Sequence, residues 1–254
     1  RGTQTSKTES EVDPNKLAKV NNWAAEVFQN NLKDPEKGKN VRQYLEKRQI
    51  SEDSIKTWRL GLATDSYESL IQAAQQRGVS MRWLEQAGLV VPQQAGYRDK
   101  FVNRLMFPIT DVTGRVIGFG GRTLGDDKAK YMNSPTTALF DKSNSLYGIE
   151  QARHKIVSSG RAVVVEGYTD VIMAHQFGCS NVVATLGTSF TTGHARTLRR
   201  YAGKLVLIFD NDIAGTEAAN RALEVCLSQN IDIKLAFVAS GKDPCDFLLS
   251  AGTE

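Results

Sequence analysis

The stretch Ala162-Val-Val-Val-Glu-Gly-Tyr-Thr-Asp170 decides the fold, together with the later stretch Lys204-Leu-Val-Leu-Ile-Phe-Asp-Asn-Asp-Ile-Ala-Gly215. In each, a short apolar run rich in β-prone residues stops at carboxylates and a glycine. This pattern is typical of a buried parallel strand that delivers charged side chains to the carboxyl edge of a sheet. Glu166 ends the first run, and Asp210 and Asp212 follow the second.

These carboxylates predict a metal site. An unpaired carboxylate is costly to bury, and converging carboxylates repel one another unless a divalent cation lies between them. Oxygen ligands of this kind suit Mg²⁺, or Mn²⁺ in its place. We therefore expect Glu166, Asp210 and Asp212 to bind metal and to be the catalytic groups. The alternative is that Asp210 or Asp212 only caps the helix that follows.

The segment around these stretches alternates between strands and helices. Four β-prone runs cover residues 162–165, 181–185, 204–209 and 232–238, and the alanine-rich segment 214–227 predicts one of the helices between them. Such alternation predicts an α/β fold with a parallel, doubly wound sheet whose sites lie beyond the strand ends. We expect this domain to span residues 159–240.

The preceding residues predict a mixed α+β subdomain over residues 14–158, so the chain is α+β overall. Residues 1–13 are polar and non-periodic and indicate a tail or linker. Helical periodicity begins at Pro14, and further helices are expected from Gly38, at 51–54, at 67–77 and at 81–87. The runs 105–109 and 115–119, separated by a turn at 111–114, predict a hairpin. Gly118-x-Gly120-Gly121 lacks the third glycine and the following helix of a dinucleotide-binding loop, so we expect close backbone approach there instead.

Composition excludes several classes of protein. The 254 residues are 41% apolar and 24% charged, which is ordinary for globular domains. The run 205–209 is far shorter than the ~18 apolar residues of a membrane-spanning helix, and no secretory signal begins the chain, so we expect a soluble, cytoplasmic protein without a membrane partner. Three cysteines without a Cys-x-x-Cys pair indicate neither a disulfide framework nor a zinc site. The formal net charge is only +4, but the segment from Arg98 to Lys155 alone carries ten bases and six acids, which favours a phosphate-bearing partner.

Two motifs resemble the TOPRIM domain, which bacterial-type primases, topoisomerases and some nucleases share. They are Glu166-Gly-x-x-Asp170 and the downstream Asp210-x-Asp212-x-Ala-Gly215. A further set, Asp99 to Ile109, Gly114 to Arg122, Lys130-Tyr-Met-Asn-Ser-Pro135 and Leu146-Tyr-Gly148, resembles the RNA polymerase core of bacterial DnaG-type DNA primases. The likeness continues through Leu186-Gly-Thr188 and Lys242-Asp-Pro244 and so covers most of the chain.

The resemblance implies a nucleotidyltransferase that synthesises short RNA primers for replication on a single-stranded DNA template, from ribonucleoside triphosphates. It implies that Asp243 is a further metal ligand and that a set of basic and amide side chains lines the groove for template and nucleotide: Arg104, Arg122, Lys130, Asn133 and Lys142. Asp170 would support Glu166, or would only stabilise the start of a helix. A location at the nucleoid, in the replisome, is also implied.

Departures from the family pattern occur at three positions. Asn211 stands where glycine is usual, Val102 where arginine is common, and Cys245 where a second acid usually follows the proline of the last motif. Asparagine tolerates turn conformations, so we expect the carboxylate geometry to survive. Residues 241–254 would begin a truncated C-terminal helical subdomain, and the family's zinc-binding domain and its helicase-interacting domain, which would recruit the replicative helicase, are not in this stretch.

Two alternative functions remain at this stage. The first is a TOPRIM nuclease or topoisomerase, although no transesterifying tyrosine domain is evident. The second is a non-catalytic fragment that binds single-stranded DNA, which the altered acid at Cys245 favours.

Overall fold

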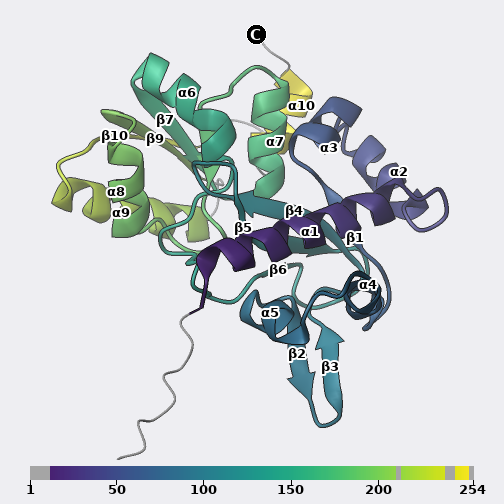
Figure 1. The fold of residues 1–254 in the computed structure, drawn as a ribbon. Coiled ribbons are helices and arrows are strands. Elements are labelled where there is room, and N and C mark those ends of the chain that lie inside the picture. Colours follow the sequence, from purple (N-terminus) through teal and green to yellow (C-terminus); the bar gives the residue numbers. More distant parts are fainter. Residues whose placement is uncertain (1–11, 210–212, 238–243, 252–254) are drawn as a thin grey trace, which may run out of the picture.

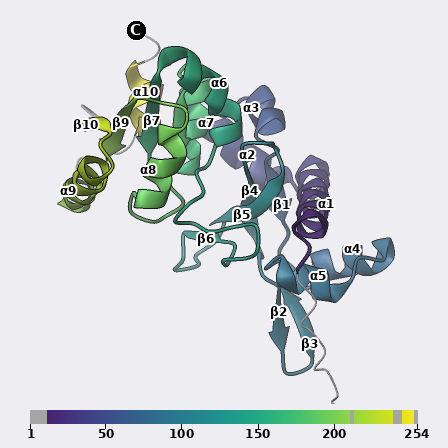
Figure 2. The ribbon, with the colours of Figure 1, turned by 60° about the vertical axis from the view of Figure 1, so that its left-hand side comes forward.

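The chain folds around two four-stranded sheets (Figures 1 and 2). A computed structural model describes residues 12–209, 213–237 and 244–251. In the N-terminal half, the sheet has the order β1-β4-β5-β6 and is antiparallel throughout. Its strands are β1 (Gly61–Ala63), β4 (Arg104–Thr110), β5 (Val116–Thr123) and β6 (Tyr131–Asn133).

Five helices surround this sheet, and all five predicted helices are confirmed. They are α1 (Pro14–Lys33), α2 (Lys39–Lys47), α3 (Glu52–Thr57), α4 (Ser69–Arg77) and α5 (Met81–Gln86). The side chain of Asp13 accepts a hydrogen bond from the backbone N–H of Asn15, and Pro14 occupies the first turn, so α1 begins where its sequence signal places it. A small hairpin of β2 (Val90–Gln93) and β3 (Gly96–Asp99) projects from this half, below α5 in Figure 1.

The predicted hairpin is confirmed as β4 and β5, which pair from Arg104 opposite Thr123 to Ile109 opposite Gly118. Asp111 shapes the turn, because its carboxylate accepts hydrogen bonds from the backbone N–H groups of Thr113 and Arg115. Gly114 supplies the left-handed conformation with φ of 83°.

The second half contains the predicted parallel sheet, in the order β10-β9-β7-β8. Its strands are β7 (Arg161–Val165), β8 (Val182–Ala184), β9 (Lys204–Phe209) and β10 (Asp232–Phe237). The helices are α6 (Ile149–Ser159), α7 (Tyr168–Gln176), α8 (Thr192–Arg199), α9 (Ile213–Ser228) and α10 (Pro244–Ala251). None of the helices in the described ranges is long and apolar enough to span a membrane.

Helices cover both faces of this sheet, which confirms the doubly wound arrangement. Successive strand residues point to opposite faces, so Val164 packs in one core with α6, α8 and α9, while Val165 packs in another with α7 and Cys245 of α10. The strand order reverses between β7 and β9, and ligand sites in such sheets lie at the carboxyl ends of the strands at that point.

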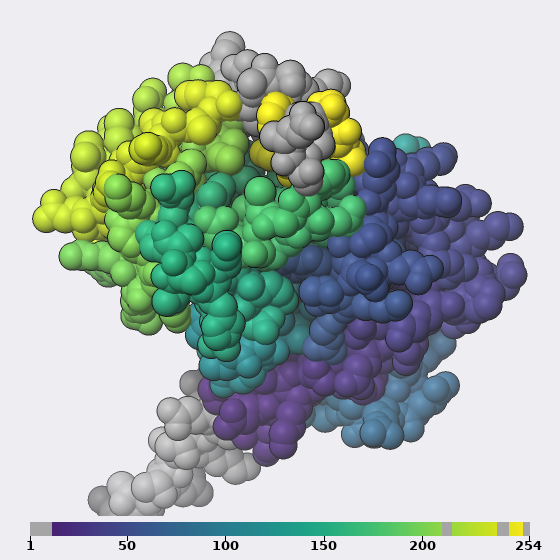
Figure 3. Space-filling model, turned by 90° about the horizontal axis from the view of Figure 1, so that it is seen from above, coloured from purple at the N-terminus to yellow at the C-terminus, as the bar shows by residue number. Residues whose placement is uncertain are grey.

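The two halves share one of these cores. Alternate residues of β4 point to α1 or to α7: Met106 packs with Phe28 of α1, whereas Phe107 packs with Tyr168 and Val171 of α7. Figure 3 shows the N-terminal residues, in purple and blue, on one side of the molecule, the yellow-green residues of α9 and β10 on the other, and teal and green residues between them. Helix α7 therefore packs against its own sheet and against the N-terminal sheet.

Candidate functional site

A cavity of about 290 Å³ opens at the carboxyl edge of the parallel sheet. It lies where the strand order reverses, beside the last residues of β7 and β9, and its lining includes Glu166, Thr185, the segment 187–190 and Arg221. This is the edge of the sheet at which the sequence predicts a site.

Glu166 is exposed at the edge of this cavity, directly after β7. Gly167 follows it and is the N-cap residue of α7. A Cβ atom at Gly167 would lie 2.5 Å from Oδ2 of Asp170, so no other residue fits there without displacing that carboxylate. The glycine of the motif thus allows the chain to turn from Glu166 into α7.

Asp170 is 6% exposed, in the first turn of α7. Its Oδ1 accepts a hydrogen bond from the backbone N–H of Cys245, at 3.2 Å, in the first turn of α10. The carboxylate therefore lies at the amino-terminal turns of two helices, where a negative charge is stabilised by the helix dipoles. This geometry favours the helix-stabilising interpretation of Asp170.

The other predicted metal ligands, Asp210, Asp212 and Asp243, lie outside the described residues. The strand that precedes Asp210 in the sequence, β9, pairs with β7, which precedes Glu166. In the part of the chain that the structure describes, no group of three or more His, Cys, Asp or Glu residues could hold a metal ion. The donor chemistry of the four carboxylates still suits a hard divalent cation.

Arg122 and Lys130 line a second cavity, of about 470 Å³, between α2 and the β5–β6 connection. The guanidinium carbon of Arg122 lies 4.4 Å from the ring centroid of Tyr44, and the ammonium of Lys130 lies 5.9 Å from that of Tyr131. A cation over an aromatic face is attracted by the ring, which helps to fix its position. The structure thus brings these two predicted residues together, and Tyr44 is a lining residue that helical periodicity alone could not single out.

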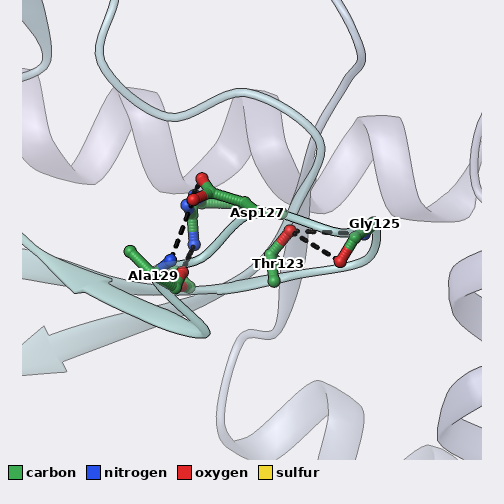
Figure 4. Close-up of polar contacts among 6 residues, drawn as sticks. Thr123, Gly125, Asp127 and Ala129 are labelled. Carbon is green, nitrogen blue, oxygen red and sulfur yellow. Dashed lines mark hydrogen bonds and ion pairs between the residues drawn. The ribbon is translucent and has the colours of Figure 1, made fainter.

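Arg104 is not part of this cavity's lining, because its side chain is only 2% exposed. Its guanidinium donates hydrogen bonds to the backbone carbonyls of Gly121 (3.2 Å) and Ala129 (3.1 Å) and forms an ion pair with Asp127. Figure 4 shows the same connection, in which Asp127 also accepts from the backbone N–H of Ala129. Arg104 therefore organises the loop between β5 and β6 from within and does not face a ligand.

Asn133 is also engaged internally. Its side-chain N–H donates to the backbone carbonyl of Leu186 at 2.7 Å, and its oxygen accepts from the hydroxyl of Tyr168. Asn133 therefore connects β6 to Leu186, beside the cavity that Glu166 lines, and to α7. Its polar atoms are used within the protein and do not face a groove.

Lys142 lines neither of these two cavities. Its backbone carbonyl contacts Nε2 of buried His194 at 2.7 Å, which holds the segment against α8. Burial lowers the pKa of nearby Lys100, and the like charges of Arg98 and Lys142 lower it further. Lys100 was not among the predicted residues, and its position in the basic segment was the only signal for it.

The comparisons with known proteins agree with this arrangement. Residues 27–153 match the family described as DNA primase catalytic core, N-terminal domain, and residues 163–248 match the family described as Toprim-like. The chain is 41% identical over 237 residues to a DNA primase of Deinococcus radiodurans. This match covers 92% of the chain and 41% of that protein.

Solved structures give the same result. The RNA polymerase domain of Mycobacterium tuberculosis primase DnaG is 36% identical, with a TM-score of 0.89, and the match covers 95% of this chain and 81% of that one. A DnaG primase catalytic domain bound to single-stranded DNA is also 36% identical, with a TM-score of 0.84, over 94% of this chain and 78% of that one. The chain thus spans about two fifths of the length of the curated relatives that it matches.

Proposed function

Because the chain belongs to the DnaG-type bacterial DNA primases, we propose that it is a DNA-dependent RNA polymerase core that synthesises short RNA primers for replication on single-stranded DNA. The single observation that carries this proposal is the position of Glu166. It is exposed at the cavity between β7 and β9, on the sheet edge where the family's carboxylates belong. The nuclease or topoisomerase alternative has no comparable support, because the N-terminal match is to a primase catalytic core.

A Toprim-like domain implies the use of a divalent metal ion in general, and we propose Mg²⁺, replaceable by Mn²⁺. Glu166, Asp210 and Asp212 would hold it, with Asp243 as a further ligand. A divalent ion bound there would stabilise the charge that develops on a transferring phosphoryl group. Glu166 would either complete the coordination or orient the attacking 3′-hydroxyl.

We propose that Arg122 and Lys130 bind phosphates of the template or of the incoming ribonucleoside triphosphate, with Lys142 as a separate contact outside their cavity. The DNA-bound relative supports a single-stranded template as the partner. The replicative helicase is a further proposed partner, on the same family resemblance. A cytoplasmic location at the nucleoid follows from the same proposed function.

The test is template-dependent incorporation of ribonucleotides with Mg²⁺ or Mn²⁺ present. We expect Asp210→Ala and Glu166→Gln to abolish incorporation. Asp232→Asn is the matched control, because Asp232 is exposed at the opposite end of the same sheet, where it pairs with Lys204 at 3.4 Å. Undiminished incorporation by Asp210→Ala would refute the metal assignment.

The alternatives predict other results in the same assay. Cleavage of plasmid DNA in the presence of metal would indicate a nuclease or topoisomerase. DNA binding that is sensitive to salt but indifferent to chelator, with no product on any template, would indicate a non-catalytic binding fragment.

A further inference from the structure

Asn133 and Tyr168 connect three separate parts of the molecule. Asn133 is the last residue of β6 in the N-terminal sheet, and Tyr168 is the first residue of α7, two positions after Glu166. The Tyr168 hydroxyl donates to the side-chain oxygen of Asn133, and the side-chain N–H of Asn133 donates to the carbonyl of Leu186. Both ends of one amide are therefore used, each in the role that its chemistry permits.

The ring of Tyr168 is fixed by its surroundings. It is 4% exposed, lies 4.8 Å from the ring of Phe107 in a stacked arrangement, and meets the ring of Tyr147 edge to face at 4.7 Å. A Cβ atom at Gly120 would lie 2.3 Å from the Tyr168 ring, so the absence of a side chain there lets the ring contact β5 directly. The hydroxyl consequently points to Asn133 from a ring that has little freedom to move.

The third part is the segment 186–190, which begins at the buried Leu186 and supplies four residues to the lining of the cavity beside Glu166. Gly187 has a φ of 68° there, and a Cβ atom on it would lie 3.7 Å from Nδ2 of Asn133. The hydrogen-bonded pair of Tyr168 and Asn133 thus connects the two segments beside the cavity, the one that follows Glu166 and the one from Leu186 to Phe190.

Asn133 is also close, along the β5–β6 strand pair, to the cavity that Arg122 and Lys130 line. In the β5–β6 pair, Gly120 lies opposite Asn133 and Arg122 lies opposite Tyr131. Arg122 therefore lies on β5, and Lys130 directly before β6, in the same strand pair whose Asn133 accepts the hydrogen bond from Tyr168.

We propose that Tyr168 and Asn133 are positioning residues, which fix Glu166 and the segment 186–190 relative to the strands that carry Arg122 and Lys130. A template or nucleotide bound by the basic residues then meets the carboxylates in one geometry. This inference rests on the proposed function and assigns to Asn133 a role different from direct contact with nucleic acid. Positioning matters because a displacement of about 1 Å can cost about a hundredfold in rate.

The chain offers a matched control for this proposal. Tyr147 belongs to the same aromatic cluster, and within the described ranges its buried hydroxyl has no hydrogen-bond partner. Tyr168→Phe and Tyr147→Phe therefore remove the same atom from neighbouring buried rings, but only Tyr168→Phe breaks the connection to Asn133. Asn133→Asp is the second variant, because a carboxylate can still accept from Tyr168 but cannot donate to Leu186.

The first measurement is hydrogen exchange without metal or substrate. We expect the backbone amides of residues 166–169 and 186–190 to exchange about tenfold faster in Tyr168→Phe, because the loss of a buried hydrogen bond favours local opening. Asn133→Asp should accelerate exchange in 186–190. Exchange at wild-type rates in both variants would overturn the proposal.

The second measurement separates binding from turnover. For Tyr168→Phe we expect kcat for primer synthesis to fall at least about tenfold, with affinity for single-stranded DNA unchanged and Mn²⁺ binding, measured by electron paramagnetic resonance, weakened. Tyr147→Phe should match the wild type. Equal loss of kcat in both variants would indicate a merely structural role and would overturn the proposal.

Primer synthesis by the wild type and by Asp210→Ala distinguishes the two levels of inference. If the wild type makes no primers on any template, the proposed function fails, and the exchange rates still decide whether Tyr168 and Asn133 hold the segments 166–169 and 186–190. If Asp210→Ala binds Mn²⁺ and synthesises primers like the wild type, only the metal assignment fails. If Asp210→Ala is inactive while Tyr168→Phe has wild-type kcat and Mn²⁺ affinity, the proposed function stands and the positioning role fails.

Discussion

The guanidinium of Arg104, buried under the β5–β6 connection, forms an ion pair with the carboxylate of Asp127, which is itself 49% exposed. The same guanidinium donates to two backbone carbonyls, of Gly121 and Ala129. A surface loop is thus bound to the interior of the sheet by a single side chain.

Loss of this ion pair should destabilise the loop. We expect Asp127→Asn to lower the free energy of unfolding by about 1–2 kcal/mol, since Arg104 keeps its two carbonyl partners, and Arg104→Met to lower it by about 2–4 kcal/mol. Urea denaturation measures both values. Asp126→Asn is the matched control, because it removes the same charge from the exposed neighbouring position, and a loss equal to that of Asp127→Asn would contradict this view.

Asp99 should give the protein an unusual dependence on pH. Its carboxylate accepts hydrogen bonds from the backbone N–H groups of Leu70 (2.7 Å) and Ile71 (3.2 Å) at the start of α4, yet burial raises its pKa from 3.8 to about 6. The folded protein therefore holds this proton more tightly than the unfolded chain does. Its contribution to the free energy of unfolding is fully present below about pH 4 and is lost as the pH rises through about 6, by up to about 3 kcal/mol in all.

Asp99→Asn should abolish this contribution, because an amide does not titrate in this range. We expect the difference in unfolding free energy between wild type and Asp99→Asn to shift in favour of the wild type as the pH falls from 7.5 to 4.5. Urea midpoints at several pH values measure it. Asp65→Asn, at an exposed position, is the control, and an unchanging difference for Asp99→Asn would refute the assignment.

Gly120 should not tolerate any side chain. Because a Cβ atom would lie 2.3 Å from the Tyr168 ring, we expect Gly120→Ala to destabilise the protein by about 1–3 kcal/mol through overpacking. Gly203→Ala is the control, since a Cβ atom there meets nothing within 4 Å, and it should change stability by less than about 0.5 kcal/mol. Thermal unfolding compares the two, and similar melting temperatures would show that the ring can move away.

Arg122 should contribute one phosphate contact. Arg122→Gln should weaken binding of single-stranded DNA and reduce the slope of log affinity against log salt by about 0.7, the value for one contact to a single strand. Arg161→Gln is the control, because Arg161 is exposed at the opposite end of β7 from the cavity. A slope unchanged by Arg122→Gln would exclude a phosphate contact by this residue.

The helices and the buried parallel strands, including the three-residue β8, could be predicted from the sequence, whereas the short strands of the N-terminal half could not. Buried parallel strands are continuous apolar runs, so β9 was evident, and its neighbour β7 likewise. β1 and β6 have three residues each, too few for a period of two to be visible, and the β2–β3 hairpin contains Pro92 and several exposed residues.

The site divides in a similar way. Glu166 was singled out because a carboxylate directly follows a buried strand in two separate motifs, and Glu166 does line the cavity at that edge. Arg104 and Asn133 were expected to face a groove, but their partners Asp127 and Leu186 are 23 and 53 residues away, so a single sequence does not reveal that their polar atoms are used inside the protein.

Helix α7 packs against β4 through Tyr168 and Val171 as well as against its own sheet, and this limits how the two halves can be exchanged. A Toprim-like unit excised from this chain would expose to water the apolar side chains of α7 that β4 covers here. Transplanting this sheet edge into another protein would therefore require a replacement for the N-terminal sheet.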